Sequence, residues 1–247
     1  MKILIASDLH LEFEDFSMTP SPVDVVVLAG DIHIGKKGVK WISEQLPDIP
    51  VIYVLGNHEY YGETYPKLVR NLKQQTQHTN ISILENESSQ IENVTFFGCT
   101  LWTDFELFGN PRLDGFACQQ IMTDYKRIRR EPNYSKIRSI DVSMIHKRSV
   151  YWLSQAYKAK KSEKNIIITH HAPSIRSIPP GQEGNQISAA YASHLDALII
   201  KLAPNYWVHG HIHKRCDYQI GKTRVICHPK AYPDERKDHY ENLVITI

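Results

Sequence analysis

The chain is predicted to be an α/β protein, and two observations carry this prediction. Short apolar runs rich in β-branched residues alternate with stretches of helical spacing, as in proteins built on parallel sheets. Five of these runs are followed directly by a cluster of Asp, His or Asn side chains. The five runs are Lys2–Ser7, Val23–Ala29, Val51–Leu55, Asn165–Thr169 and Tyr206–Val208.

The first hundred residues predict an order of strand, loop and helix. Lys2–Ser7 and Val23–Ala29 are near-continuous apolar runs of the kind that is buried on both faces of a parallel sheet. Lys37–Gln45 has helical spacing, and Pro47 ends it. The other elements expected here are a strand at Val51–Leu55, a helix at Tyr65–Gln75, and strands at Ile81–Leu84 and Val94–Cys99.

Residues 102–165 interrupt this order and predict a mainly helical insert. The segment from Trp102 to Gly115 is expected to form a loop or cap, followed by a helix near Gln119–Ile128 and a long helix at Ser139–Lys160. The long helix gathers apolar and small residues on one face: Val142, Ile145, Ser149, Trp152 and Ala156. Two interpretations of the insert's aromatic residues are equally open, a cap over an active site or a small core under a loop. These residues are Trp102, Phe105, Phe108 and Tyr125.

The alternation of strands and helices resumes after the insert. A strand at Asn165–Thr169 is followed by a loop rich in Pro and Gly, Pro173–Gly184, and by a helix capped near Ser188. Closing strands are expected at Tyr206–Val208, Arg224–Cys227 and Leu243–Ile247. Because no linker or repeat divides the chain, we expect a single domain over residues 1–247.

The composition is that of an ordinary globular protein, with 42% hydrophobic and 23% charged residues. A net charge of +2 gives no strong attraction to nucleic acid or membrane. No stretch approaches the ~20 apolar residues of a membrane span, and the first apolar run is too short for a signal peptide. We therefore expect a cytoplasmic location. Four cysteines without a C-x-x-C pair are expected to be reduced thiols, although four cysteines of a secreted protein could pair: Cys99, Cys118, Cys216 and Cys227.

The polar clusters after the strands predict a metal centre. They are Asp8-Leu9-His10, Gly30-Asp31, Gly56-Asn57-His58-Glu59, His170-His171 and Gly210-His211-Ile212-His213. Carboxylate, imidazole and amide groups are ligands of ions such as Mn, Fe and Zn. A single cluster would be weak support, because a buried His or Asp is more often a satisfied core group. Five clusters at strand ends favour metal ligation over coincidence.

The arrangement of these residues predicts two ions. Two ions about 3.5–4 Å apart need a bridging carboxylate that gives an oxygen to each. Asp31 is the best bridge, because it stands alone after a buried strand and Gly30 lets the backbone turn tightly. The other ligands divide into Asp8, His10 and His213 for one ion, and Asn57, His170 and His211 for the other. Ligands without Cys favour Mn and also accept Fe, Zn, Ni or Co.

Such a centre predicts phosphoester hydrolysis. Two ions lower the pKa of a bound water and clamp the oxygens of a phosphoryl group, so a metal-bridging hydroxide is expected to attack phosphorus. His58 lies next to a predicted ligand but is left over from coordination. It is therefore predicted to serve as general acid toward the leaving oxygen or to stabilise charge on the transferred phosphoryl group. Glu59 either orients His58 or is an ordinary loop carboxylate.

The motifs D-x-H, G-D, G-N-H-E, H-H-A-P and G-H-x-H, in this order from residue 8 to residue 213, resemble those of the calcineurin-like metallophosphoesterase superfamily. The resemblance implies a four-layer αββα sandwich with a two-metal site at the C-terminal edges of the sheets. It assigns the ligand roles to the seven residues named above and the catalytic role to His58. The family pattern favours His170 over His171, which is then a supporting or substrate-side residue. His228 and Ala231 depart from a segment that in many relatives is N-P-x-G-Y.

Three functions compete on these observations. A hydrolase of a small phosphomonoester or phosphodiester is the first. A nuclease is the second, but the superfamily's repair nucleases usually carry extra DNA-binding or capping domains, and this chain has no room for one beyond its insert. The basic residues between Lys126 and Arg138 are better explained as a solvated face, because acidic residues interleave with them. A non-catalytic scaffold is the third, and it predicts missing ligands, whereas all eight positions are filled here.

Overall fold

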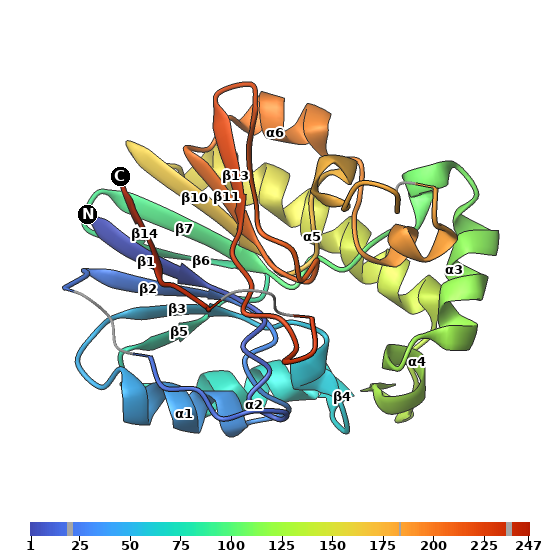
Figure 1. Ribbon diagram of the computed structural model, residues 1–247, viewed down its shortest axis with the longest axis horizontal. Helices are drawn as coiled ribbons and strands as arrows, with labels where there is room; N and C mark the ends of the chain where they lie inside the picture. The colour runs from blue at the N-terminus through green and yellow to red at the C-terminus, as the bar shows by residue number, and fades with distance from the viewer. Residues whose placement is uncertain (19–21, 183, 236–238) are drawn as a thin grey trace.

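The computed structural model describes residues 1–18, 22–182, 184–235 and 239–247. Two sheets pack face to face between two layers of helices, which is the predicted four-layer αββα sandwich (Figure 1). The first sheet has the order β14-β1-β2-β3-β5. Its strands are β14 (Leu243–Thr246), β1 (Lys2–Ala6), β2 (Val25–Ala29), β3 (Val51–Val54) and β5 (Ile81–Ile83).

Helices cover the outer face of the first sheet. They are α1 (Lys37–Gln45) and α2 (Lys67–Gln75), the lowest layer in Figure 1. Successive side chains of a strand point to opposite faces. Leu4, Val26 and Tyr53 therefore share one face, and they are buried in one apolar cluster with Ile42 of α1 and Leu72 of α2.

The second sheet has the order β12-β13-β11-β10-β7-β6. Its strands are β12 (Cys216–Ile220), β13 (Thr223–Cys227), β11 (Tyr206–His209), β10 (Lys164–Thr169), β7 (Val94–Cys99) and β6 (Glu87–Ile91). Two helices cover its outer face, α5 (Ser139–Lys160) and α6 (Asp196–Leu202). Phe97 and Trp207 are buried there against Leu153 of α5 and Ile199 of α6.

A third apolar cluster fills the space between the sheets. Ile5 and Val27 of the first sheet pack there with Phe96, Ile168 and Val208 of the second, and none of these five residues is exposed to solvent. Strands β1, β2, β3 and β5 run parallel to one another, as do β7, β10, β11 and β13. The carboxyl ends of each parallel set meet at one edge, so the loops that follow them are brought together.

The insert differs in detail from the prediction. The prediction of one helix near Gln119–Ile128 is wrong, because the structure has two helices there, α3 (Pro111–Ile121) and α4 (Asp124–Arg127). Pro111 occupies the first turn of α3, where its missing N–H needs no partner. The loop predicted up to Gly115 therefore ends earlier. The long helix α5 has the predicted bounds, although Leu153 is fully buried in place of the half-buried Trp152.

Other departures concern short or half-exposed elements. The helix expected near Ser188 is only a 3₁₀ turn at Gln186–Ala190, and α6 was not anticipated. Strands β6 and β12 were also missed. A small sheet joins β4 (Thr64–Tyr65), β8 (Arg129–Arg130) and β9 (Ser135–Lys136), so α2 begins two residues later than expected. In the predicted loop Pro173–Gly184, residue 183 lies outside the described residues.

The insert's aromatic residues belong to the core. Trp102, Phe105 and Tyr125 are buried in the cluster that also covers the first sheet, and Phe108 packs against it. All four cysteines are free. None of the helices that the structure describes combines the length and apolarity needed to cross a membrane.

Candidate metal centre and active site

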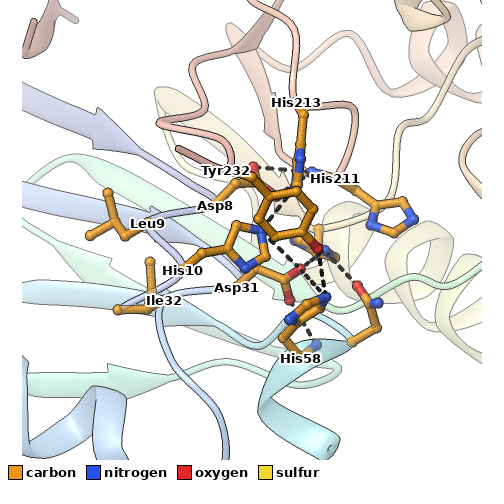
Figure 2. A network of polar contacts seen from close by, with 12 residues as sticks. Asp8, Leu9, His10, Asp31, Ile32, His58, His211, His213 and Tyr232 are labelled. Atoms are coloured by element: carbon orange, nitrogen blue, oxygen red, sulfur yellow. Dashed lines mark hydrogen bonds and ion pairs between the residues drawn. The ribbon is translucent and has the colours of Figure 1, made fainter. Parts of the chain in front are cut away.

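The seven predicted ligands and His58 gather at one edge of the sandwich. Figure 2 shows Asp8, His10, Asp31, His58, His211 and His213 among them. Each motif follows the carboxyl end of a parallel strand. Asp8 and His10 follow β1, Asp31 follows β2, Asn57 and His58 follow β3, His170 follows β10, and His211 and His213 follow β11.

Six of these side chains form two groups of donor atoms that share one carboxylate. The donor atoms of Asp8, His10, Asp31 and His213 lie within 4.8 Å of one another, and so do those of Asp31, His170 and His211. Asp31 Oδ2 lies 3.8 Å from His10 Nε2 and 3.4 Å from His170 Nε2. The geometry offers two neighbouring ion positions with Asp31 between them.

Several donor atoms at these positions face another acceptor or have no hydrogen-bond partner among the described residues, and a bound cation would satisfy them. His10 Nε2 and His213 Nε2 face one another at 2.9 Å. His211 Nε2 is buried and has no hydrogen-bond partner among the described residues. A buried polar atom without a partner is costly, and an imidazole nitrogen can satisfy that need by binding a divalent ion.

Two glycines of the motifs leave room for the carboxylates. A Cβ on Gly56 would collide with Asp31 Oδ1, and one on Gly210 would lie 2.6 Å from Asp8 Oδ2. Such contacts are too close for any larger residue, so the G-N-H-E and G-H-x-H motifs require glycine there. Five predicted ligands also hold a left-handed backbone with φ between 48° and 69°. They are Asp8, His10, Asp31, His211 and His213.

The imidazoles are oriented by hydrogen bonds from Nδ1. His170 Nδ1 donates to the carbonyl of Ala29 at 2.9 Å. His213 Nδ1 pairs with Glu235 Oε2 at 2.6 Å, and His10 Nδ1 pairs with a carboxylate oxygen of Glu12 at 3.1 Å. Fixing Nδ1 in this way leaves Nε2 of each ring for an ion, the usual arrangement around metal-binding histidines.

Asn57 is oriented from the insert. Its Nδ2 donates to Asp124 Oδ1 at 2.9 Å, and the hydroxyl of Tyr61 donates to the same oxygen at 2.7 Å. Asn57 Oδ1 then faces His170 Nε2 at 3.1 Å. Asp124 begins α4, so a residue of the insert sets the direction of a predicted ligand in the G-N-H-E motif.

The charges of these groups are strongly coupled. Burial opposes ionisation of Asp31, but the charges of His170 and His58 hold its pKa well below the usual range. Burial likewise opposes protonation of His170, yet Asp31 raises its pKa to about 9. For His213, Asp8 and Glu235 outweigh burial and raise the pKa to about 10. Both imidazoles are therefore in the cationic, doubly protonated form near neutral pH when no ion is bound.

His58 lies between three polar partners. Its Nδ1 pairs with Glu12 Oε1 at 2.7 Å, and its Nε2 lies 3.1 Å from the hydroxyl of Tyr232 and 3.9 Å from Asp31 Oδ2. Burial lowers the pKa of His58, but the charges of Asp31 and Glu12 and the hydrogen bond to Glu12 raise it overall. Glu12 also pairs with His10, so it links the His58 ring to a predicted ligand.

The hydrogen bonds of Glu59 give it a role that differs from the two roles considered from the sequence. Its carboxylate accepts four hydrogen bonds of 2.6–3.0 Å that tie the end of β2 to the end of β3. The donors are the backbone N–H groups of Asp31, Ile32 and Gly56 and the hydroxyl of Tyr53. Burial and the Asp31 charge raise the pKa of Glu59 to about 7. Its position supports Asp31 rather than His58.

His171 lies behind the two groups of donors. Its ring packs between Trp102 and His211, with centroids 5.1 Å and 4.3 Å away, and its Nδ1 is 3.2 Å from the carbonyl of Thr100. Burial and the charge of His170 hold its pKa well below the usual range, so the ring is neutral. His171 therefore supports His211 by packing.

A cavity of about 510 Å³ opens over the predicted ion positions. Its floor includes Asp31, Asn57 and His211, while its walls come from residues 121–124 of the insert and from residues between Pro179 and Tyr191. A second cavity of about 470 Å³ lies beside it. Four residues line both cavities: His58, Tyr61, Thr123 and Tyr232.

Four site residues were not found by sequence reasoning: Glu12, Asp124, Tyr232 and Glu235. Glu12 follows the D-x-H motif by two residues, which is a local signal. Tyr232 closes the segment that departs from the family pattern, and Figure 2 shows its ring beside His10 and His213. Asp124 and Glu235 come from segments whose position depends on the whole fold.

Comparisons with known proteins agree with the fold. A protein of Acanthamoeba polyphaga mimivirus, itself uncharacterized, is 25% identical over an alignment of 273 positions that covers 96% of this chain and 94% of the relative. The phosphopantetheinyl hydrolase PptH of Mycobacterium tuberculosis has a similar structure, with a TM-score of 0.77 and 17% identity over 99% of this chain and 95% of that one. The protein TT1561 of Thermus thermophilus has a TM-score of 0.53 and 13% identity, with 92% and 88% of the two chains covered.

The family model for calcineurin-like phosphoesterases matches residues 1–215, which contain all five motifs. This family suggests metal-dependent hydrolysis of phosphoesters, and its members typically bind two divalent metal ions. The extent of this match and the two-sheet fold confirm the resemblance inferred from the motifs. The chain therefore belongs to the calcineurin-like phosphoesterase family.

Proposed function

We propose that the chain is a two-metal hydrolase of a small phosphomonoester or phosphodiester. The observation that carries the proposal is the position of Asp31, whose carboxylate belongs to both groups of donor atoms. We name the position of Asp8, His10 and His213 with Asp31 the outer position. We name the position of Asn57, His170 and His211 with Asp31 the inner position. Manganese is the first choice of metal, and a single domain in the cytoplasm remains part of the proposal.

The proposed chemistry divides between the ions and the chain. When bound, the two ions activate a water and neutralise charge on the phosphoryl oxygens. His58 faces the cavity and donates the proton from Nε2 to the leaving oxygen. Glu12 holds the other ring nitrogen, and the charges of Glu12 and Asp31 keep the imidazole protonated. Tyr232 keeps Nε2 in place through its hydroxyl.

A small substrate fits the cavities better than nucleic acid does. Volumes of about 510 and 470 Å³ lie in the usual range of about 300–1,000 Å³ for small-molecule sites. Two arginines of the basic stretch, Arg130 and Arg138, each pair with Asp141 at 3.0 Å, which supports a solvated structural role. PptH is named for hydrolysis at a phosphopantetheinyl group, but 17% identity supports only a shared fold.

The test compares p-nitrophenyl phosphate with bis-p-nitrophenyl phosphate. The protein is stripped with a chelator and either left bare or loaded with Mn, Fe, Zn, Ni or Co. We expect metal-dependent turnover, with the preferred compound indicating a monoesterase or a diesterase. Absence of turnover on both compounds while two ions are bound would favour a selective natural substrate or the non-catalytic scaffold.

The His58→Ala variant tests the general acid. We expect it to keep both ions and to lose about 10²–10⁴-fold in turnover, the usual contribution of a positioned acid. His78→Asn is the matched control, because His78 is exposed at the opposite end of the first sheet and its left-handed backbone suits asparagine. Near-full turnover in His58→Ala would remove the proposed role.

A further inference from the structure

A second cluster of metal-binding side chains lies outside the proposed two-metal centre. The donor atoms of His209, Cys216 and Cys227 are within 4.8 Å of one another. They come from the end of β11, the start of β12 and the end of β13. Cys216 and Cys227 stand directly opposite each other in the antiparallel pair β12–β13. Two sulfurs and an imidazole therefore converge from three strands.

The His209 ring is held in the form that binds metals. Its Nδ1 donates to the carbonyl of Gly210 at 2.9 Å, which leaves the lone pair on Nε2. Nε2 lies 3.7 Å from Cys216 Sγ. In a tetrahedral zinc site, bonds of about 2.3 Å to sulfur and about 2.0–2.1 Å to nitrogen place these two atoms about 3.6 Å apart. The observed separation is close to that value.

An oxygen stands beside the other donors. Ser177 Oγ lies 2.8 Å from His209 Nε2 and 3.8 Å from Cys216 Sγ, and the hydroxyl of Tyr218 is 2.7 Å from it. His209, Cys227 and Ser177 are buried, whereas Cys216 is partly exposed. The cluster is therefore buried except on the side of Cys216, which lies near the surface and from which an ion can enter.

We propose that His209, Cys216 and Cys227 bind a zinc ion, with an oxygen as the fourth ligand. Thiolate and imidazole ligands suit zinc, whereas the proposed two-metal centre offers no sulfur. Buried cysteines often act only as small apolar side chains. That alternative does not account for an imidazole nitrogen that lies 3.7 Å from Cys216 Sγ in the same group of donor atoms.

The zinc ion would have a structural role. It joins the β12–β13 hairpin to the end of β11, and the next residues along the chain from β11 include His211 and His213. Beyond Cys227, the chain continues to Tyr232, which contacts His58. The ion would thus hold together two segments that reach the proposed active site.

Cobalt provides the test, because thiolate ligands give Co²⁺ an intense charge-transfer band in the near ultraviolet. The proposed two-metal centre has no cysteine, so this band reports on the second cluster alone. We expect the band in the chelator-stripped wild-type chain on adding cobalt, and its loss when zinc is added. It should be absent in Cys216→Ser and in Cys227→Ala. Cys118→Ser is the matched control, since Cys118 is a buried thiol on α3, and it should keep the band.

Absence of the band in the wild-type chain at saturating cobalt would overturn the proposal, whatever the variants do. A count of two free thiols instead of four in the unreduced, denatured chain would also overturn it, because Cys216 and Cys227 would then form a disulfide. Zinc X-ray absorption of the wild-type chain gives an independent measure. Sulfur neighbours at about 2.3 Å are expected there, and only nitrogen and oxygen neighbours would count against the site.

Discussion

The proposed inner and outer positions differ in which groups orient their predicted ligands. At the outer position, the carboxylates of Glu12 and Glu235 orient two imidazoles, and the His213 side chain is 15% exposed. At the inner position a backbone carbonyl orients His170, whose side chain is fully buried. Backbone atoms keep their place when pH or salt changes, whereas partly exposed ion pairs respond to both. We therefore expect the inner position to bind more tightly and the outer position to exchange its ion.

Removing Asp31, the predicted ligand that the two positions share, should abolish metal binding at both. Asp31→Ala takes away the bridging carboxylate, so both ions should be lost. Because two ions supply several kcal/mol of stabilisation, turnover should fall by at least about 10³-fold. Metal analysis after gel filtration measures the ion content. A variant that retained one full equivalent of metal would show that one position binds its ion without Asp31.

Changing the carboxylates that orient the predicted ligands should weaken metal binding at one position and leave the other unchanged. Glu235→Gln weakens the support of His213 at the outer position, and Asp124→Asn weakens that of Asn57 at the inner position. Each change should reduce metal affinity by about 10–100-fold at its own position only. Calorimetric titration with Mn resolves the two affinities. Equal weakening of both positions by either variant would contradict the division proposed here.

Metal affinity should rise with pH. An imidazole must lose its proton to bind an ion. With pKa values raised to about 9 for His170 and about 10 for His213, protons compete with the metal throughout the neutral range. Affinity should increase by about tenfold per pH unit for each competing proton, and the increase at the outer position should extend to higher pH.

Proton release is the direct measurement of this competition. Titrations of the stripped chain with Mn in two buffers of different ionisation enthalpy give the number of protons released. We expect release at about pH 7.5, and less of it in Glu235→Gln, because that variant removes a charge that raises the pKa of His213. Binding without proton release would show that the histidines are already neutral.

The smallest effect is expected from Glu12→Gln. Glu12 raises the pKa of His58, so its neutral replacement should lower that pKa. A general acid works only while protonated, so the alkaline limb of the pH–rate profile should move down by about one pH unit. The profile is measured at saturating metal, because Glu12 also contacts His10. Glu235→Gln is the control, since it disturbs the outer position without touching His58.

The candidate ligands could be named from the sequence because their positions follow from local patterns. Each lies just after a buried apolar strand, and the ends of parallel strands meet. The layers of the fold follow from the same strands, since continuous apolar runs such as Val25–Ala29 are buried on both faces.

The rest of the site depends on long-range packing. Asp124 reaches Asn57 across 67 residues of sequence, and Glu235 reaches His213 across 22 residues that include the β12–β13 hairpin. The half-exposed strands β6 and β12 carry polar residues and lack the apolar run that marks a buried strand. The start of α3 was missed because Gly115 weakens the helical pattern, which packing then restores.

The left-handed backbone at five predicted ligands has an evolutionary consequence. A residue other than glycine held in that conformation costs about 1 kcal/mol or more, which bound ions can offset. A descendant that no longer needed metal would lose that compensation. Substitutions to glycine at Asp8, Asp31 or His211 would then stabilise the fold, so selection would tolerate them early. In such lineages the D-x-H and G-H-x-H signatures would disappear while the strands before them persisted.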